Sequence, residues 1–405
     1  MALDRRQFLS SVLAGCSAAA SPLLTPVSLA SAPWDQRLVV IILRGALDGI
    51  DAIRPVGDPD FEVYRRVILK RDRGEAPDLD GYFALHPALA GLMPLWRSGE
   101  FAAVQATSTP YRDKWSHFDG QAVLEAGGGN DVFDQPADGW LNRLMTVAPG
   151  VEAETAFAVG RSQMQILAGD APHSVWRPRT SLRISPQAEK LLELVYHDDP
   201  LFRDAALTAA DIIGTLREEA DEDDPAMADA GMAMQGMEGA SGFSGEVTRF
   251  VVERLLQDTR IASFSINGWD THAGQGQALE NRLGQLADTI LLMRAGLGDV
   301  WRKTAVLVMT EFGRTARANG NEGTDHGTGG AMFMAGGAIR GGKIYGDWPG
   351  LAEASLYNRR DLMPTRDIRA YAGWAMRGMF GTGSSDIERI IFPGLDLGDD
   401  PGILL

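Results

Sequence analysis

Cysteine is nearly absent from this sequence. Its 405 residues include a single one, Cys16. The chain after Cys16 therefore has no disulfide, no thiolate metal ligand and no thiol nucleophile.

Nucleotide-binding motifs are also missing. Glycine-rich runs occur at Gly327–Gly330, Gly336–Gly337 and Gly341–Gly342, but none reads GxGxxG between a strand and a helix and none is a P-loop. These runs are typical of tight turns, so we expect no nucleotide cofactor.

Positive charge is scarce, and the formal net charge is −16. A strongly acidic protein is a poor partner for nucleic acid or for an anionic membrane surface. An anionic substrate is still compatible with this charge if a metal ion supplies local positive charge.

No apolar run is long enough for a stable membrane span. The apolar stretch from Phe8 to about Leu24 is interrupted by Ser, Gly and Pro22, whereas a spanning helix needs roughly 20 apolar residues.

The N-terminus instead has the features of an export signal. Arg5 and Arg6 precede the apolar stretch, and a small-residue segment follows at 28–32. We predict a twin-arginine signal peptide within residues 1–32. Cleavage after Ala30 is favoured over cleavage after Ala32, because the latter would leave Pro33 as a poor first residue. The twin-arginine export machinery is then a partner, and the protein is periplasmic or secreted.

A lipoprotein cleavage box is suggested by Leu13-Ala14-Gly15-Cys16. However, only nine residues separate Cys16 from Arg6, and the apolar stretch continues beyond it. We do not expect lipid anchoring at Cys16.

The rest of the chain has the pattern of an α/β domain. A hydrophobic content of 45% supports a sizeable core, and helical stretches at Gln277–Leu297 and Pro364–Phe380 alternate with apolar runs. Nearly continuous runs are typical of strands buried on both faces of a parallel sheet. The expected strands are Leu38–Leu43, Phe101–Ala106, Ile261–Ile266, Thr304–Met309 and Ala331–Ala335.

One segment does not follow this pattern. Residues 217–246 begin with six acidic side chains and continue with Ala, Gly and four methionines. We interpret them as a flexible surface insertion in a domain that spans 33–405.

Polar residues follow the expected strands. In open α/β sheets, ligands gather beyond the carboxyl ends of strands, so we expect these residues at one edge. His117 and His272 have this placement, and His326 shortly precedes the fifth expected strand. Imidazole with carboxylate suits zinc and similar divalent metals, although a loop histidine is also often only hydrogen-bonded within the structure.

Carboxylates accompany these histidines. Asp270 precedes His272 by two residues, and Asp325 precedes His326. Asp48 follows the first strand, as a metal ligand or as a turn residue. Glu311 ends an apolar strand, where burial requires a partner, either a metal or Arg314.

Ser116 stands at the start of an expected helix that ends at Gly127. Serine is a favoured N-cap. The functional alternative is a hydroxyl nucleophile at a helix N-terminus, where an anionic phosphate or sulfate would be stabilised. Arg112 could hold that anion, or could be solvated.

Several strings resemble the domain of unknown function 1501 family, from about Arg37 to about Pro393. They are LVVIILRGALDGID, HPALAGLMPLW, RDKWSHFDGQAVLEAG, GWLNRLM, NGWDTHAGQ, LVMTEFGRT and TDHGTGGAMFMAGGAIRGGKIYG. That family is placed with the alkaline phosphatase and sulfatase superfamily. The resemblance implies a three-layer α/β/α sandwich with a central, mostly parallel sheet.

The superfamily pattern also implies site residues. Its aspartate after the first strand corresponds to Asp48, and its hydroxyl nucleophile to Ser116. Its later Asp and His correspond to Asp270 and His272, and its final histidine to His326. Its adjacent Asp-His pair has no match, because Glu311-Phe312 stands there.

These residues lead to two hypotheses about function. The first is an exported, metal-dependent hydrolase of a small phosphate or sulfate ester, with zinc as the expected ion. Its metal ligands would be Asp48, Asp270, His272, Glu311, Asp325 and His326, and its catalytic residues Ser116, His117, Arg112 and Arg314. The second is a non-catalytic periplasmic binding or assembly protein that keeps the fold with a degraded metal site.

Overall fold

The computed structural model describes residues 34–71, 73–148, 155–159, 164–176 and 243–405. The predicted signal peptide lies outside them, as does the predicted insertion up to residue 242. In the described part, a nine-stranded sheet forms the centre. Its strands in spatial order are β10 (Ile344–Tyr345), β4 (Phe101–Ser108), β9 (Gly330–Ala335), β8 (Thr304–Thr310), β1 (Arg37–Arg44), β7 (Ile261–Asn267), β5 (Ala156–Val159) and β6 (Ser174–Trp176), while β11 (Arg366–Asp367) also pairs with β4.

The five expected strands are all present, as β1, β4, β7, β8 and β9. Every residue of β4, β8 and β9 is buried, which explains why their sequences are apolar without alternation. The shorter strands were not expected, because two to four residues carry too little periodicity to be recognised.

The sheet is mixed but mostly parallel. β1 pairs in parallel with β7 and β8, whereas β9 runs antiparallel between β8 and β4. As a result, β1, β4, β7 and β8 all end at the edge where β9 begins. This edge receives the loops that carry the predicted site residues.

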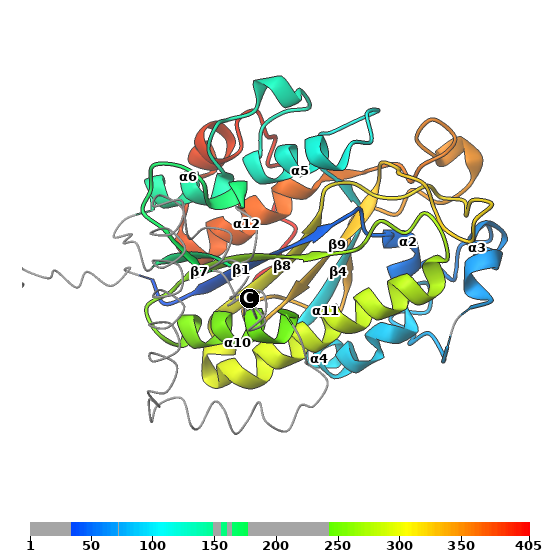
Figure 1. Cartoon of the computed structure of the whole chain (residues 1–405), viewed down its shortest axis with the longest axis horizontal. Helices are drawn as coiled ribbons and strands as arrows, with labels where there is room; N and C mark the ends of the chain where they lie inside the picture. Colours follow the sequence, from blue (N-terminus) through cyan, green and yellow to red (C-terminus); the bar gives the residue numbers. More distant parts are fainter. Residues whose placement is uncertain (1–33, 72, 149–154, 160–163, 177–242) are drawn as a thin grey trace, which may run out of the picture.

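Helices cover both faces of the sheet, so the α/β/α sandwich is confirmed (Figure 1). Leu38, Val40 and Ile42 of β1 face one core with α5, α6 and α12, while the alternate residues face a second core with α4, α10 and α11. The helices are α4 (Met93–Arg97), α5 (His117–Ala126), α6 (Trp140–Val147), α10 (Phe243–Leu256), α11 (Gln275–Leu297) and α12 (Ile368–Phe380).

The start of α12 corrects the prediction of a helix from Pro364. The helix begins at Ile368, and Asp367 caps it by accepting a hydrogen bond from the Arg369 amide. Immediately before it, β11 pairs with the end of β4. Strand pairing thus occupies the residues that follow Pro364.

Within the described residues, no helix combines the length and apolar character that a membrane crossing requires.

A buried ion pair connects the loop that follows β1 to a short helix beside the sheet edge. Asp48 caps α2 (Gly49–Ala52), and its carboxylate accepts two hydrogen bonds from Arg65 of α3 (Phe61–Leu69). Both side chains are almost completely buried. Gln275 donates a further bond to the same carboxylate at 2.7 Å.

We predict that Arg65→Met destabilises the protein by about 3–5 kcal/mol, because it leaves the Asp48 charge buried without its partner. The matched control is Arg71→Met. Arg71 pairs with Glu322 but its side chain is 63% exposed, so this change should cost less than about 1 kcal/mol. Urea unfolding measures both, and similar losses for the two variants would contradict the prediction.

Candidate metal centre

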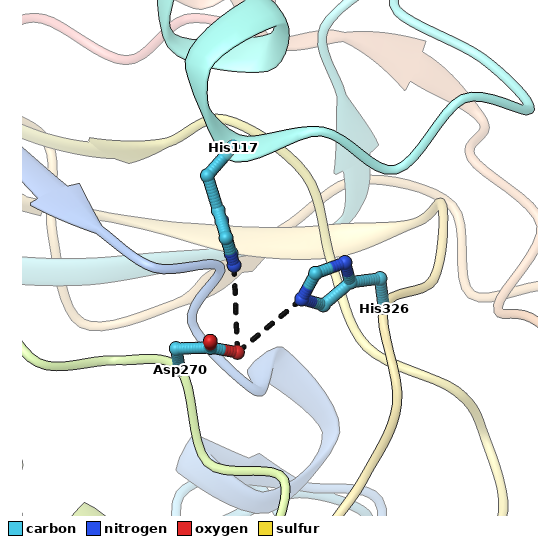
Figure 2. Close-up of side chains that lie close together, drawn as sticks. All are labelled: His117, Asp270 and His326. Carbon is cyan, nitrogen blue, oxygen red and sulfur yellow. Dashed lines mark hydrogen bonds and ion pairs between the residues drawn. The ribbon is translucent and has the colours of Figure 1, made fainter.

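Three side chains from distant parts of the chain meet at the sheet edge (Figure 2). His117 is the first residue of α5, Asp270 follows β7, and His326 precedes β9. One ligand atom from each lies within 4.8 Å of the others, so the group could hold a metal ion. The Asp270 Oδ1 atom is 3.4 Å from His117 Nε2 and 3.3 Å from His326 Nε2.

His272 adds a third imidazole to this group. Its Nε2 atom lies 3.1 Å from Asp270 Oδ1 and 2.9 Å from His326 Nε2. Three Nε2 atoms therefore surround one carboxylate oxygen.

Each imidazole is held from behind through its other nitrogen. His117 Nδ1 lies 2.9 Å from Glu311 Oε1, His272 Nδ1 lies 3.3 Å from Asp325 Oδ1, and His326 Nδ1 lies 2.8 Å from the carbonyl oxygen of Trp115. Carboxylate and carbonyl oxygens only accept hydrogen bonds. The hydrogen-bond network therefore places the proton of each neutral imidazole on Nδ1.

This assignment leaves the Nε2 lone pairs of the three histidines facing the anionic Asp270 oxygen, with those of His272 and His326 2.9 Å apart. Lone pairs at such distances repel unless a proton or a metal ion lies between them. His117 Nε2 is buried without a hydrogen-bond partner, since its contact with Asp270 lacks hydrogen-bond geometry. A buried unpaired nitrogen is costly, and cation binding would remove this cost.

The charges around the group shift its pKa values. The hydrogen bond to Glu311 raises the pKa of His117, despite an opposing effect of burial. Burial lowers the pKa of His326. Burial acts to raise the pKa of Asp270, but the hydrogen bond and charge of Arg314 prevail and lower it to about 2. Asp270 is thus an anion over the whole physiological range.

Arg314 fixes Asp270 in place. Its side chain is fully buried and also donates to the carbonyl oxygens of Gly45, Ala46 and Thr324. One guanidinium thereby joins the loops that follow β1 and β7 to the loop that precedes β9. Because its donors meet protein acceptors, the described structure supports a positioning role for Arg314, and its predicted catalytic role stays a prediction.

Two glycines permit the close approach that this geometry needs. A Cβ atom on Gly45 would lie 2.6 Å from the Asp270 amide nitrogen, and one on Gly120 would lie 2.9 Å from the Phe312 ring. Gly120 lets α5 pack directly on the strand end that carries Glu311. The distance between His117 and Glu311 depends on that packing.

Two residues predicted as metal ligands lie behind the histidines. Glu311 is fully buried and also accepts from the Gly45 amide at 2.8 Å. It pairs with His117, so the alternative of a Glu311–Arg314 ion pair is not what the structure shows. Asp325 accepts from Asn319 at 2.9 Å in addition to contacting His272. Their ligation of a metal stays a prediction.

Three further predicted residues make other contacts. Asp48 is engaged by Arg65 and Gln275, as described above. Ser116 caps α5, its Oγ accepting from the Asp119 amide at 3.4 Å. Arg112 turns back onto its own loop and donates to Ser108 Oγ at 3.0 Å. Their roles as ligand, nucleophile and anion holder remain predictions.

Two groups that support the histidines on the side of the sheet, Gln121 and the Trp115 carbonyl, were not predicted from the sequence. Gln121 donates to Glu311 Oε1 at 3.3 Å and accepts from Arg44 at 2.7 Å. Its position four residues after His117 places both on one face of α5, a signal that was available. The contact of the Trp115 carbonyl with His326 could not be predicted from the sequence, because every residue type has a main-chain oxygen.

The fold and this group define an α/β/α protein with a candidate histidine-rich metal centre. The family model described as "Protein of unknown function (DUF1501)" matches residues 35–372, and the chain belongs to this family. The sequence resemblance to the family is thereby confirmed.

No curated protein matches the chain. A solved structure of a TAB5 alkaline phosphatase mutant with Mg bound matches at a TM-score of 0.34 and 12% identity, covering 78% of this chain and 94% of that one. A likeness at this level assigns no activity.

We predict that Gly120→Ala destabilises the protein by about 1–3 kcal/mol, because the added methyl group overpacks the Phe312 ring. The control is Gly284→Ala in α11, where an added Cβ meets no atom within 4 Å. Helix propensity alone should make that variant neutral or about 1 kcal/mol more stable. Urea unfolding of both variants is the measurement, and a neutral Gly120→Ala would show that α5 does not depend on this approach.

Proposed function

We propose that the protein is an exported, metal-dependent hydrolase of a phosphate or sulfate ester, with zinc held by His117, Asp270 and His326 and with His272 beside them. The observation that carries the proposal is the convergence of three Nε2 atoms on the Asp270 carboxylate. Imidazole and carboxylate are the donors that zinc accepts, with bonds of about 2.0–2.2 Å.

The spacing of the donor atoms supports this choice. Neighbouring ligand atoms of a tetrahedral site with bonds of about 2.0 Å lie about 3.3 Å apart. The separations from Asp270 Oδ1 to the three Nε2 atoms are 3.1, 3.3 and 3.4 Å. Among His117, Asp270 and His326, all the ligand atoms lie within 4.8 Å of one another, so one ion could contact all three.

The chain's own residues would keep the ligands in place. Glu311, Asp325 and the Trp115 carbonyl hold the Nδ1 protons, which fixes the tautomer and the direction of each ring. Arg314 holds the Asp270 carboxylate. Such supporting contacts matter for affinity, and their loss typically weakens metal binding 10- to 100-fold.

The exposed side of the group is where a substrate would bind. The side chains of Asp270 and His272 are 45% and 44% exposed, so small molecules can reach them. A bound divalent ion would polarise an ester oxygen and lower the pKa of a water molecule. An anionic ester fits this chemistry, because the ion supplies the positive charge that the acidic chain lacks.

The second candidate is a binding protein that holds the ion without turnover. A specific observation favours it: Ser116 Oγ is used as the cap of α5 and Arg112 is turned onto its own loop. In the hydrolase, attack by water rather than by Ser116 would be consistent with these contacts.

Metal content and turnover test the proposal together. We expect purified wild-type protein to contain one zinc per chain, and His326→Ala to lose it along with hydrolysis of aryl phosphates or aryl sulfates. His173→Ala is the matched control, because His173 contacts the Ala171 carbonyl away from the group. It should keep metal and activity. Elemental analysis and an ester panel before and after chelation are the measurements.

The outcomes separate the candidates. Metal lost in His326→Ala but no turnover by the loaded wild type would favour the binding protein. Wild-type protein that stays free of metal after incubation with zinc would contradict both.

Export is the remaining part of the proposal. The double variant Arg5→Lys/Arg6→Lys should leave the protein uncleaved in the cytoplasm, because the arginine pair defines the signal. Gln7→Ala serves as the control and should still be exported. Immunoblots of periplasmic and cytoplasmic fractions are the measurement, and export of the double variant would rule out the twin-arginine route.

A further inference from the structure

Trp115 and Arg360 each contact His326, and they also contact each other. His326 donates from Nδ1 to the Trp115 carbonyl at 2.8 Å, while Arg360 donates to the His326 carbonyl at 2.9 Å. The Arg360 guanidinium also lies over the Trp115 ring, 4.8 Å from its centroid. An aromatic ring and a cation are thus fixed beside a candidate metal ligand.

Both side chains are partly open to solvent. Trp115 is 38% exposed, and the side chain of Arg360 is 39% exposed. Tryptophan is usually well buried, because its ring is large and apolar. Its partial exposure next to the metal group needs an explanation beyond folding.

The backbone around this pair is held in an unfavourable conformation. Asp113 and Trp115 have φ values of 61° and 48°, and Asn358 and Arg359 have values of 50° and 55°. Non-glycine residues rarely adopt positive φ, and such strain is often found at binding sites.

A hydrogen bond connects the two strained loops. The Tyr357 hydroxyl donates to the Asp113 carboxylate at 3.0 Å. The Trp115 loop and the Arg360 loop are therefore held together, and the positions of the ring and the cation are fixed before any ligand arrives.

We propose that Trp115 and Arg360 form a specificity site for the part of an ester that does not react, and that the preferred substrates are anionic esters carrying a flat ring. The ring would stack on the exposed part of Trp115. The guanidinium of Arg360, which also pairs with Asp361 at 3.1 Å, would attract the anionic head at the metal group. This inference rests on the proposed function, because it needs the ester head to lie at the metal group.

Non-hydrolysable ligands test the inference by binding rather than by turnover. Phenylphosphonate and methylphosphonate carry the same anionic head and differ in the ring. With zinc-loaded protein, calorimetry should show tighter binding of phenylphosphonate. Trp115→Ala should weaken phenylphosphonate about tenfold and methylphosphonate much less, since it removes the stacking surface as well as the ring against which Arg360 packs.

Further variants distinguish the loss of the ring contact from a general disturbance of the structure. Trp115→Phe should restore most of the preference, because it retains an aromatic face. Arg360→Gln should weaken both ligands. Tyr82→Ala is the matched control: Tyr82 is 37% exposed but contacts Phe83 away from the metal group, and its loss should change neither affinity. Zinc content should stay at one per chain in every variant.

The failures of the two proposals are distinguishable. Equal binding of the two phosphonates, or a preference that survives Trp115→Ala, would overturn the specificity site and leave the hydrolase proposal intact. Failure of zinc-loaded protein to bind either phosphonate would count against both, as would the absence of a zinc site.

Discussion

The geometry of the sheet edge depends on the buried guanidinium of Arg314. A cation without solvent contact must satisfy its donors within the protein, and this one does so on main-chain oxygens of three different loops and on Asp270. The parallel strands bring those loops to the same edge, but the strands do not fix how far the loops stand apart. Arg314 sets that separation, and with it the position of Asp270 among the histidines.

The three histidines show a second constraint: each imidazole ring needs a hydrogen-bond acceptor at Nδ1 to fix its orientation. Each ring is held through Nδ1 by an acceptor from another part of the chain, and the acceptors are themselves held. Glu311, for example, is bonded by the Gly45 amide and by Gln121. The group is consequently stiff on the side of the sheet and open on the side of the solvent. This asymmetry suits a site whose ligands must keep their positions while small molecules exchange.

The sequence predicted the fold and the location of the site better than the division of roles within it. Continuous apolar runs identify strands buried on both faces, and strand ends that carry Asp and His identify an edge. The contact partners of these side chains could not be predicted in the same way. Asp48 contacts Arg65 and Gln275, and Glu311 contacts His117, across separations of up to 227 residues along the chain. No local pattern specifies such pairings, so ligands and supporting residues look alike in the sequence.

Whether Asp270 would bind the metal ion bears on catalysis, because it affects how many protein ligands the ion would have. Its Oδ1 atom is shared between Arg314 and the three imidazoles. Four protein ligands close a tetrahedral zinc site, whereas three leave a position for water, as catalytic sites require. An ion held by three of these four side chains would keep the open position that hydrolysis needs. Arg314 would compete with that ion for the Asp270 oxygen, so the hold of Arg314 on the carboxylate would influence which three side chains bind the ion.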